Sequence, residues 1–184
     1  MDHAIVVYLN QLAVSSSSFE QATIFLARSF PYVLFLLFVF FIVRESPVFY
    51  TRFILLAEGL IAGVLARVGV ELIRFYVHRL RPLVEDSAIQ GLLVEQSYSF
   101  PSGHAGFFFA LATVVYARDR GWGFWFFVGA VLNGLARIAS GVHYPSDIIG
   151  GALLGILVGG GVALALRKYL KTDAIPPSVT PPVR

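Results

Sequence analysis

The sequence contains no cysteine and few charged residues, and each shortage excludes a class of protein. Without cysteine, the 184-residue chain has neither a disulfide framework nor a thiolate nucleophile or metal ligand. Only 14% of its residues are charged, 57% are hydrophobic, and the mean hydropathy is +0.76. A soluble domain has about 25% charged residues, so this composition indicates an integral membrane protein. A net charge of +3 without a long basic run predicts no nucleic-acid partner.

The N-terminal stretch does not have the pattern of a secretory signal peptide. Residues 1–18 carry no Lys or Arg ahead of their apolar part, where a signal peptide has a basic region. As a helix, Ala4–Val14 would be about 16 Å long, too short to cross a bilayer. We therefore expect a short interfacial helix, with a sixth span left open as the alternative.

Five apolar runs predict membrane-spanning helices, at Thr23–Val43, Phe53–Val77, Ala105–Ala117, Trp122–Ala139 and Ile148–Leu166. The expected fold is therefore all-α, a polytopic membrane helix bundle. Residues 1–171 are expected to form one membrane-embedded domain. Residues 172–184 contain four prolines and no periodicity, which predicts a disordered cytoplasmic tail. The last run carries Gly151, Gly155 and Gly159, a spacing typical of closely packed helices.

The second predicted span contains four charged residues, Glu58, Arg67, Glu71 and Arg74. The last three share one helix face, because they are four and three residues apart. A charge inside a span costs several kcal/mol unless it pairs or lines a cavity. For Glu58, Arg67 and Glu71 we favour an internal ion-pair ladder, extended by Arg28. The alternative is one wall of an anion site, and for Arg74 that alternative is preferred.

The basic residues predict the topology. With alternate loops on alternate sides, one side collects eight of them: Arg44, Arg52, Arg118, Arg120, Arg167, Lys168, Lys171 and Arg184. The positive-inside rule makes that side cytoplasmic. The N-terminus and the loops at 78–100 and 140–145 then lie outside. Arg79 and Arg81 are basic residues on that outer side and need another reason to be there.

A polar stretch, Pro101-Ser102-Gly103-His104, precedes the third predicted span. Proline and serine there indicate a helix start, where free N–H groups and the helix dipole attract anions. Taken alone, the stretch is most often a simple cap. Glycine allows a ligand to approach the backbone closely, and His104 would stand beside it.

A second polar stretch, residues 137–147, lies between the fourth and fifth predicted spans. Asp147 follows His143 by four residues, so its carboxylate can accept the ring N–H and make the other nitrogen a better nucleophile. A helix-start hydrogen bond is the commoner explanation of that spacing alone. His104, His143 and Asp147 also form a two-histidine, one-carboxylate set that suits a metal. Nearby arginines argue against a bound cation.

Three polar clusters therefore fall on the predicted outer side: 74–82, 101–104 and 137–147. Their arginines (Arg74, Arg81 and Arg137) match phosphate oxygens with paired N–H donors. The backbone N–H groups of Ser102, Gly103 and His104 add further donors. Such a cage supplies the positioning and charge stabilisation that phosphoryl transfer needs, without a cofactor. The aromatic residues Tyr98, Phe100 and Phe107–Phe109 are expected to be lipid-facing or core residues, with a wall for an acyl or prenyl chain as the alternative.

These residues resemble the three motifs of the type 2 phosphatidic acid phosphatase superfamily of membrane lipid phosphatases. Its first motif is Lys, six residues, then Arg-Pro, which Arg81-Pro82 fits with Arg74 in the lysine position. The second motif, Pro-Ser-Gly-His, is matched in full. The third is Ser-Arg, five residues, His, three residues, Asp. It is matched by Arg137, His143 and Asp147, with Ala136 in place of the serine, so one hydroxyl contact is missing.

The resemblance implies an acid-phosphatase or vanadium-haloperoxidase-like core and a role for each matched residue. His143 would be the nucleophile that forms a phosphohistidine, Asp147 would orient it, and His104 would be the general acid. The phosphoryl oxygens would be bound by five residues: Arg74, Arg81, Ser102, Gly103 and Arg137. No metal or other cofactor is implied.

Within the superfamily, the chain looks most like bacterial undecaprenyl pyrophosphate phosphatases, multi-pass proteins of the plasma membrane with an outward-facing site. Phosphatidylglycerophosphate or phosphatidic acid phosphatases are the alternatives, as is a lipid phosphotransferase with the same site. The vanadium haloperoxidases of the superfamily are soluble, unlike this chain. A protein that binds lipid headgroups without activity would need only the arginines, so the presence of His104, His143 and Asp147 argues against that alternative. The expected partners are the lipid substrate and membrane lipids, and the oligomeric state is left open.

Overall fold

The computed structural model describes residues 1–45 and 48–172, the last five of them as backbone only. The helices within these residues are α1 (Asp2–Val14), α2 (Ser17–Ile24), the π-helical segment η1 (Phe25–Ser29), α3 (Phe30–Glu45), α4 (Phe49–Tyr76), α5 (Pro82–Glu85), α6 (Gly103–Arg118), α7 (Arg120–Ala139) and α8 (Pro145–Thr172). The predicted all-α class is confirmed. Of the predicted tail, residues 173–184 lie outside the described residues.

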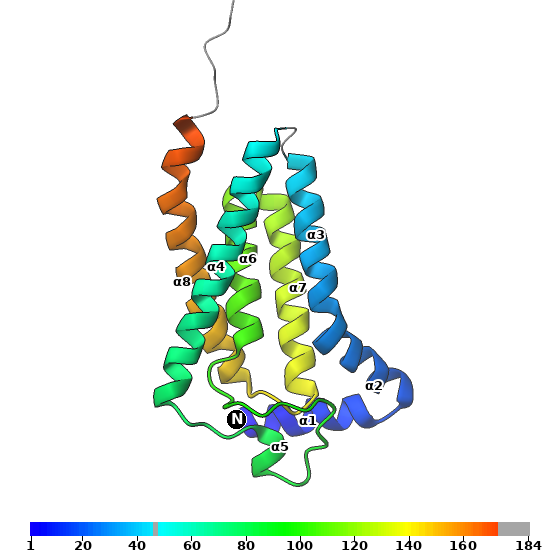
Figure 1. The fold of residues 1–184 in the computed structure, drawn as a ribbon. Helices are drawn as coiled ribbons and strands as arrows, with labels where there is room; N and C mark the ends of the chain where they lie inside the picture. The colour runs from blue at the N-terminus through cyan, green and yellow to red at the C-terminus, as the bar shows by residue number, and fades with distance from the viewer. Residues whose placement is uncertain (46–47, 173–184) are drawn as a thin grey trace, which may run out of the picture.

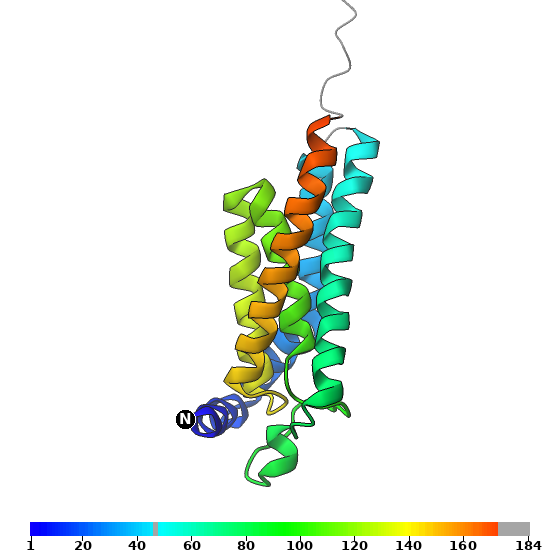
Figure 2. The same cartoon turned by 90° about the vertical axis from the view of Figure 1, so that its left-hand side faces the viewer.

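The five longest helices, α3, α4, α6, α7 and α8, run side by side (Figures 1 and 2). Helix α6 is the central one and packs against α4, α7 and α8, while α3 packs against α4 and α7. Between α3, α6 and α7 lies an apolar core that includes Phe38, Leu111 and Phe126. Many outward-facing side chains are apolar too, as expected for a bundle surrounded by lipid.

Within the described residues, four helical stretches are long and apolar enough to cross a membrane: Ser17–Glu45, Phe49–Tyr76, Arg120–Ala139 and Pro145–Arg167. Helix α6 has 16 residues, about 24 Å. The first stretch begins at Ser17 rather than at the predicted Thr23, because α2, η1 and α3 follow one another without a break. Pro31 has no N–H to donate to the Ala27 carbonyl, and the π-helical segment accommodates this within a continuous helix.

The glycine stripe of α8 packs directly on the backbone of α6. A Cβ atom built on Gly151 would lie 2.4 Å from the Ser102 carbonyl oxygen, and one on Gly155 would lie 2.4 Å from that of Gly106. Such distances are shorter than any real contact, so only glycine allows the two helices to approach this closely. The predicted close packing is confirmed, and it fixes the start of α8 against the start of α6.

The predicted ion-pair ladder on α4 is only partly correct. Arg67 and Arg74 both pair with Glu71, at 2.9 and 3.2 Å. Glu58 instead accepts a hydrogen bond at 2.6 Å from Arg118 at the end of α6. Arg28 does not extend the ladder, since it makes no ion pair among the described side chains. The ladder fails there because Arg28 is on η1, which packs against α7 rather than against α4.

Helix α1 lies across one end of the bundle (Figures 1 and 2). Its buried Asn10 side chain donates to the carbonyls of Gln90 and Ala139, at 2.8 and 2.9 Å, and accepts from the Gln90 N–H. These bonds attach α1 to the 86–102 loop and to the end of α7. The helix therefore closes the end of the bundle where the three predicted polar clusters lie.

Candidate active site

The three predicted polar clusters meet at the end of the bundle that α1 closes (Figure 1). Arg74 lies in the last turn of α4, Arg81 directly precedes α5, Ser102 caps α6, and His143 lies in the short loop between α7 and α8. The hydrogen bond from the Ser102 N–H to the Asp147 carbonyl oxygen, 2.9 Å long, joins the second cluster to the third. The predicted convergence is confirmed.

His143 and Asp147 form a buried pair at the centre of the site. Each has at most 1% of its surface exposed, and His143 Nδ1 lies 3.4 Å from Asp147 Oδ2. The same carboxylate oxygen accepts the Tyr144 N–H at 2.7 Å and the Ser99 hydroxyl. With Nδ1 facing the carboxylate, Nε2 faces outward to Arg81 Nη1, 3.4 Å away. The arrangement leaves Nε2 as the reactive nitrogen.

The imidazole of His143 is neutral at neutral pH. Burial lowers the pKa of His143 to about 4, although the hydrogen bond with Asp147 acts in the opposite direction. The positive charges of Arg137 and Arg81 lower it further. A neutral ring has a free lone pair, which a nucleophile requires.

Arg81 is the most firmly held of the predicted phosphate-binding residues. Its Nε donates to the Ser97 carbonyl and its Nη1 to the Val142 carbonyl, both at 2.7 Å, and Nη2 donates to the Ser97 hydroxyl at 3.0 Å. Burial lowers the pKa of Arg81 to about 10, so it stays charged at neutral pH. A fixed guanidinium is thus held beside the Nε2 atom of His143.

Arg74 shares a contact with Arg81, although it stands where lysine was expected. Its Nη1 donates to the Ser97 hydroxyl at 3.2 Å, and its Nε donates to the Pro101 carbonyl at 3.1 Å. The side chain is buried. The longer, forked arginine side chain therefore reaches both the 86–102 loop and the start of α6 from the last turn of α4.

Arg137 is buried between η1 and the 86–102 loop. Its Nη1 donates to the Ala27 carbonyl at 3.5 Å, which also accepts from the Asn133 side chain at 3.3 Å and receives no N–H from Pro31. Its Nη2 donates to Glu95 Oε1 at 2.5 Å. Its Nε, also buried, has no partner among the described residues. This guanidinium therefore has spare donor capacity for a ligand.

Glu95 supplies a negative charge to two arginines of the cage, Arg137 and Arg81. Its second oxygen lies 3.7 Å from Arg81 Nη2. Burial by itself raises the pKa of Glu95, but the hydrogen bond and charge of Arg137 outweigh this and the pKa is lowered. The ionised carboxylate thus bridges two arginines, as a phosphate group would.

The start of α6 presents Gly103 and His104 to the site. The Ser102 hydroxyl accepts the Ala105 N–H at 3.4 Å, so Ser102 is the N-cap rather than a first-turn residue. The predicted use of the Ser102 N–H for a ligand is wrong, because that group is bonded to Asp147. The N–H groups of Gly103 and His104 are the donors that the helix start presents. His104 lines a cavity of about 500 Å³ together with Glu95 and Arg137.

Arg79 and Asp2 are site residues that the sequence did not reveal. Arg79 Nη1 donates to Asp147 Oδ1 at 2.9 Å, and Nη2 donates to Asp2 Oδ2 at 3.0 Å. The guanidinium also lies 4.0 Å from the centre of the Tyr144 ring. Burial by itself lowers the pKa of Arg79, but the hydrogen bond to Asp2 and the charge of Asp147 outweigh this, and the pKa is raised. These contacts explain why a basic residue stands on the predicted outer side.

The metal alternative does not fit the arrangement. Within the described part of the chain, no three His, Asp or Glu side chains are grouped so that they could hold a metal ion. Asp147 directs both of its oxygens to protein hydrogen-bond donors rather than toward a metal site, namely Arg79, Ser99 and the Tyr144 N–H. The donor set is that of an anion site.

Comparison with known proteins agrees with this geometry. The family model described as the PAP2 superfamily matches residues 52–171. Bacitracin transport permease protein BcrC of Bacillus licheniformis is 29% identical over 82% of this chain and 73% of its own length. Undecaprenyl-diphosphatase BcrC of Bacillus subtilis is 29% identical over 54% of this chain and 50% of its own length. The crystal structure of Aquifex aeolicus LpxE superposes with a TM-score of 0.71 at 26% identity, covering 88% of this chain and 93% of LpxE.

Proposed function

Because this chain belongs to the PAP2 superfamily and is a PAP2-type membrane lipid phosphatase, we propose that it hydrolyses undecaprenyl diphosphate to undecaprenyl phosphate and inorganic phosphate. The observation that carries the proposal is the buried His143–Asp147 pair, with Nε2 facing the arginine cage. The undecaprenyl substrate is supported by the similarity to the undecaprenyl-diphosphatase of Bacillus subtilis.

In the proposed mechanism, Arg74, Arg81 and Arg137 bind the terminal phosphoryl group, together with the N–H groups of Gly103 and His104. Substrate oxygens take over the contacts that Glu95 makes with the arginines. The Nε2 lone pair of His143 attacks phosphorus as the bond to the bridging oxygen breaks. Asp147 accepts the hydrogen bond of the Nδ1–H group, which keeps its proton, and stabilises the positive charge on the ring.

His104 completes each half of the reaction in this mechanism. Its imidazolium, favoured by the negative charge of the bound phosphate, gives a proton to the departing bridging oxygen. The neutral ring then takes a proton from water as that water attacks the phosphohistidine. Breaking the nitrogen–phosphorus bond releases inorganic phosphate, and both histidines return to their starting states. No metal is needed in either half.

The proposed topology has five spans and an outward site. Helix α6 would be the fifth span, because it packs against α4, α7 and α8 in the middle of the bundle (Figure 1). Helix α1 would lie at the interface, with residues 1–171 as one domain in the plasma membrane. Arg44, Arg118 and Arg120, at the end away from the site, would face the cytoplasm.

Cysteine labelling tests this orientation, because the chain has no cysteine of its own. Ser87→Cys, on the proposed outer side, should react with an impermeant maleimide in intact cells. Gly121→Cys, on the proposed cytoplasmic side, should not.

The activity is tested by phosphate release in detergent with a chelator present. The panel contains undecaprenyl diphosphate, phosphatidylglycerophosphate and phosphatidic acid. We expect the highest kcat/KM with the diphosphate, and His143→Ala should abolish turnover while His78→Ala, a histidine outside the site, should not. Preference for either monoester, or a strict metal requirement, would contradict the proposal. Labelled phosphate appearing on a second lipid rather than in solution would identify a phosphotransferase.

A further inference from the structure

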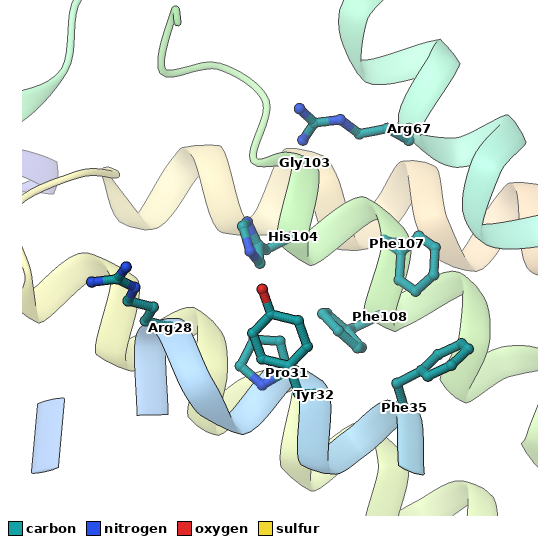
Figure 3. A pocket seen from close by; sticks show the side chains of 9 residues that line it. All are labelled: Arg28, Pro31, Tyr32, Phe35, Arg67, Gly103, His104, Phe107 and Phe108. Atoms are coloured by element: carbon teal, nitrogen blue, oxygen red, sulfur yellow. The ribbon is translucent and has the colours of Figure 1, made fainter. Parts of the chain in front are cut away.

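A second cavity lies beside His104, between α3, α4 and α6, with a volume of about 550 Å³ (Figure 3). Its walls are largely aromatic and include Phe35, Phe107 and Phe108. His104 lines both this cavity and the cavity that contains Arg137 and Glu95. A ligand in the phosphate cage can therefore continue past His104 into an apolar space without crossing the packed core.

Two arginines that belong to none of the three motifs line this second cavity. Arg67 comes from α4, and Arg28 comes from η1, where a π-helical segment interrupts the regular turns. In Figure 3 they lie on opposite sides of His104. Arg28 also lines the first cavity, so it borders both spaces. Charged residues within membrane helices are costly, and they commonly mark substrate sites.

The start of α6 accommodates the Arg67 side chain. A Cβ atom on Gly103 would lie 1.6 Å from Arg67 Nη1, so the guanidinium occupies the space that a side chain at position 103 would take. Arg67 is paired with Glu71 at 2.9 Å. Arg28 has neither an ion pair nor a hydrogen bond among the described side chains. The two arginines thus supply positive charge in excess of what Glu71 balances.

The geometry points to a binding site for a second phosphate group, and we infer that Arg28 and Arg67 bind the non-transferred phosphate of a lipid diphosphate. The terminal phosphoryl group lies in the cage, the bridging oxygen lies at His104, and the inner phosphate lies between the two arginines. The hydrocarbon chain then follows Phe35, Phe107 and Phe108. This inference deepens the proposed function and rests on it.

The inferred site also predicts a contribution to the rate. When the bridging bond breaks, the electron pair goes to the oxygen of the inner phosphate, which becomes the leaving group. His104 donates a proton to that oxygen, and guanidinium groups nearby stabilise the charge that remains. A phosphatidic acid would place an uncharged glycerol ester at the same position. The arginines should therefore distinguish diphosphates from monophosphates rather than help all substrates equally.

The experiment compares farnesyl diphosphate with farnesyl phosphate, which differ only in the inner phosphate. We expect Arg28→Gln and Arg67→Gln each to lower kcat/KM for the diphosphate about tenfold or more, the effect of losing one charged hydrogen bond. The monophosphate should change by less than about threefold. Arg120→Gln, an exposed arginine at the other end of the bundle, is the matched control and should change neither.

Arg67→Lys, which keeps a positive charge to pair with Glu71 but loses the forked pair of donors, keeps the test decisive if loss of the ion pair destabilises the protein, and it should show a smaller loss confined to the diphosphate. Equal losses on both substrates, or no loss on either, would overturn the inference while leaving the proposed diphosphatase activity intact. A wild-type protein that cleaves farnesyl phosphate but not the diphosphate would overturn the proposed function itself. Inhibition of monophosphate turnover by methylenediphosphonate supplies an independent readout. It should weaken in both arginine variants, whereas inhibition by inorganic phosphate should not.

Discussion

The two ends of the bundle each contain a buried carboxylate paired with an arginine, but the pairs are built differently. At the site end, Asp147 receives donors from Arg79, Ser99 and the Tyr144 N–H on its two oxygens. At the other end, Glu58 is bonded to Arg118 alone. Glu58 Oε1 and Arg118 Nε have no partner among the described residues.

We interpret this difference as one between a carboxylate proposed to act in the reaction and a carboxylate that joins two helices. Several donors on Asp147 fix both its position and its negative charge, as a carboxylate that orients a nucleophile requires. A single bond between Glu58 and Arg118 joins α4 to α6 without fixing a reactive atom. Burial alone therefore does not identify the site, since Glu58 is as buried as Asp147. The number and direction of the donors do identify it.

The largest effect is expected from Asp147→Asn. The amide cannot stabilise the positive charge on His143, and its NH₂ group would face donors such as Arg79. We expect kcat to fall roughly 10³-fold or more. Steady-state turnover of the lipid substrate measures this. The control is Asp86→Asn, which alters a carboxylate that is paired with His3 outside the site. A similar fall in kcat in this variant would show that Asp147 has no special role in the reaction.

Arg79→Gln tests whether the extra donors on Asp147 matter. Arg79 acts through Asp147 and touches no predicted phosphate-binding residue, so it is a positioning residue. We expect kcat to fall about 10- to 100-fold with little change in KM. Arg79→Lys should restore part of the rate, because it keeps a charged donor. A rise in KM at unchanged kcat would instead indicate direct substrate binding.

Glu58→Gln should behave in the opposite way. Removing the charge weakens the bond to Arg118, yet an oxygen acceptor is kept and Arg118 is partly exposed to solvent. We expect kcat to change by less than about twofold and thermal stability in detergent to fall, by about 1–3 kcal/mol. A large loss of kcat without loss of stability would show that the far end of the bundle also serves the reaction.

The smallest expected effect is that of pH on the protonation of His143 and on its contribution to stability. Because the pKa of His143 is lowered to about 4, its ring should stay neutral from pH 5 to 8, whereas a free imidazole titrates near 6.5. The unfolded chain takes up this proton first as pH falls. The contribution of His143 to stability is therefore complete above about 6.5 and is lost between that value and about 4. NMR of ring-labelled histidine, assigned with His143→Gln, measures this, and a midpoint near 6.5 would contradict it.

Much of the site could be predicted from local sequence. The helix starts at Ser102 and Pro145 have short-range signals, and the His143–Asp147 spacing depends on one turn of α8 alone. The glycine spacing of α8 reveals its close packing in the same way. Each of these features arises within a few residues, where backbone sterics and capping leave few conformations.

Other partners could not be predicted, because they depend on distances between segments that are remote in the sequence. Asp2 reaches Arg79 and Ser146 only because α1 folds back across the end of the bundle. Glu95 meets Arg137 because the 86–102 loop crosses the cage. No periodicity or motif marks either residue, since a loop carboxylate has the same local sequence whether it pairs or is solvated.

Composition and short-range spacing were enough to predict the membrane class, the family and the residues of the three motifs. The contacts between individual atoms came from the packing of the helices. This packing directed His143 Nε2 toward Arg81, bound Asp147 to Arg79, and placed Arg28 and Arg67 around the aromatic cavity beside His104. The physical reason is that hydrogen bonds and ion pairs depend on distance and direction, which the packing of α3, α4, α6 and α8 fixes.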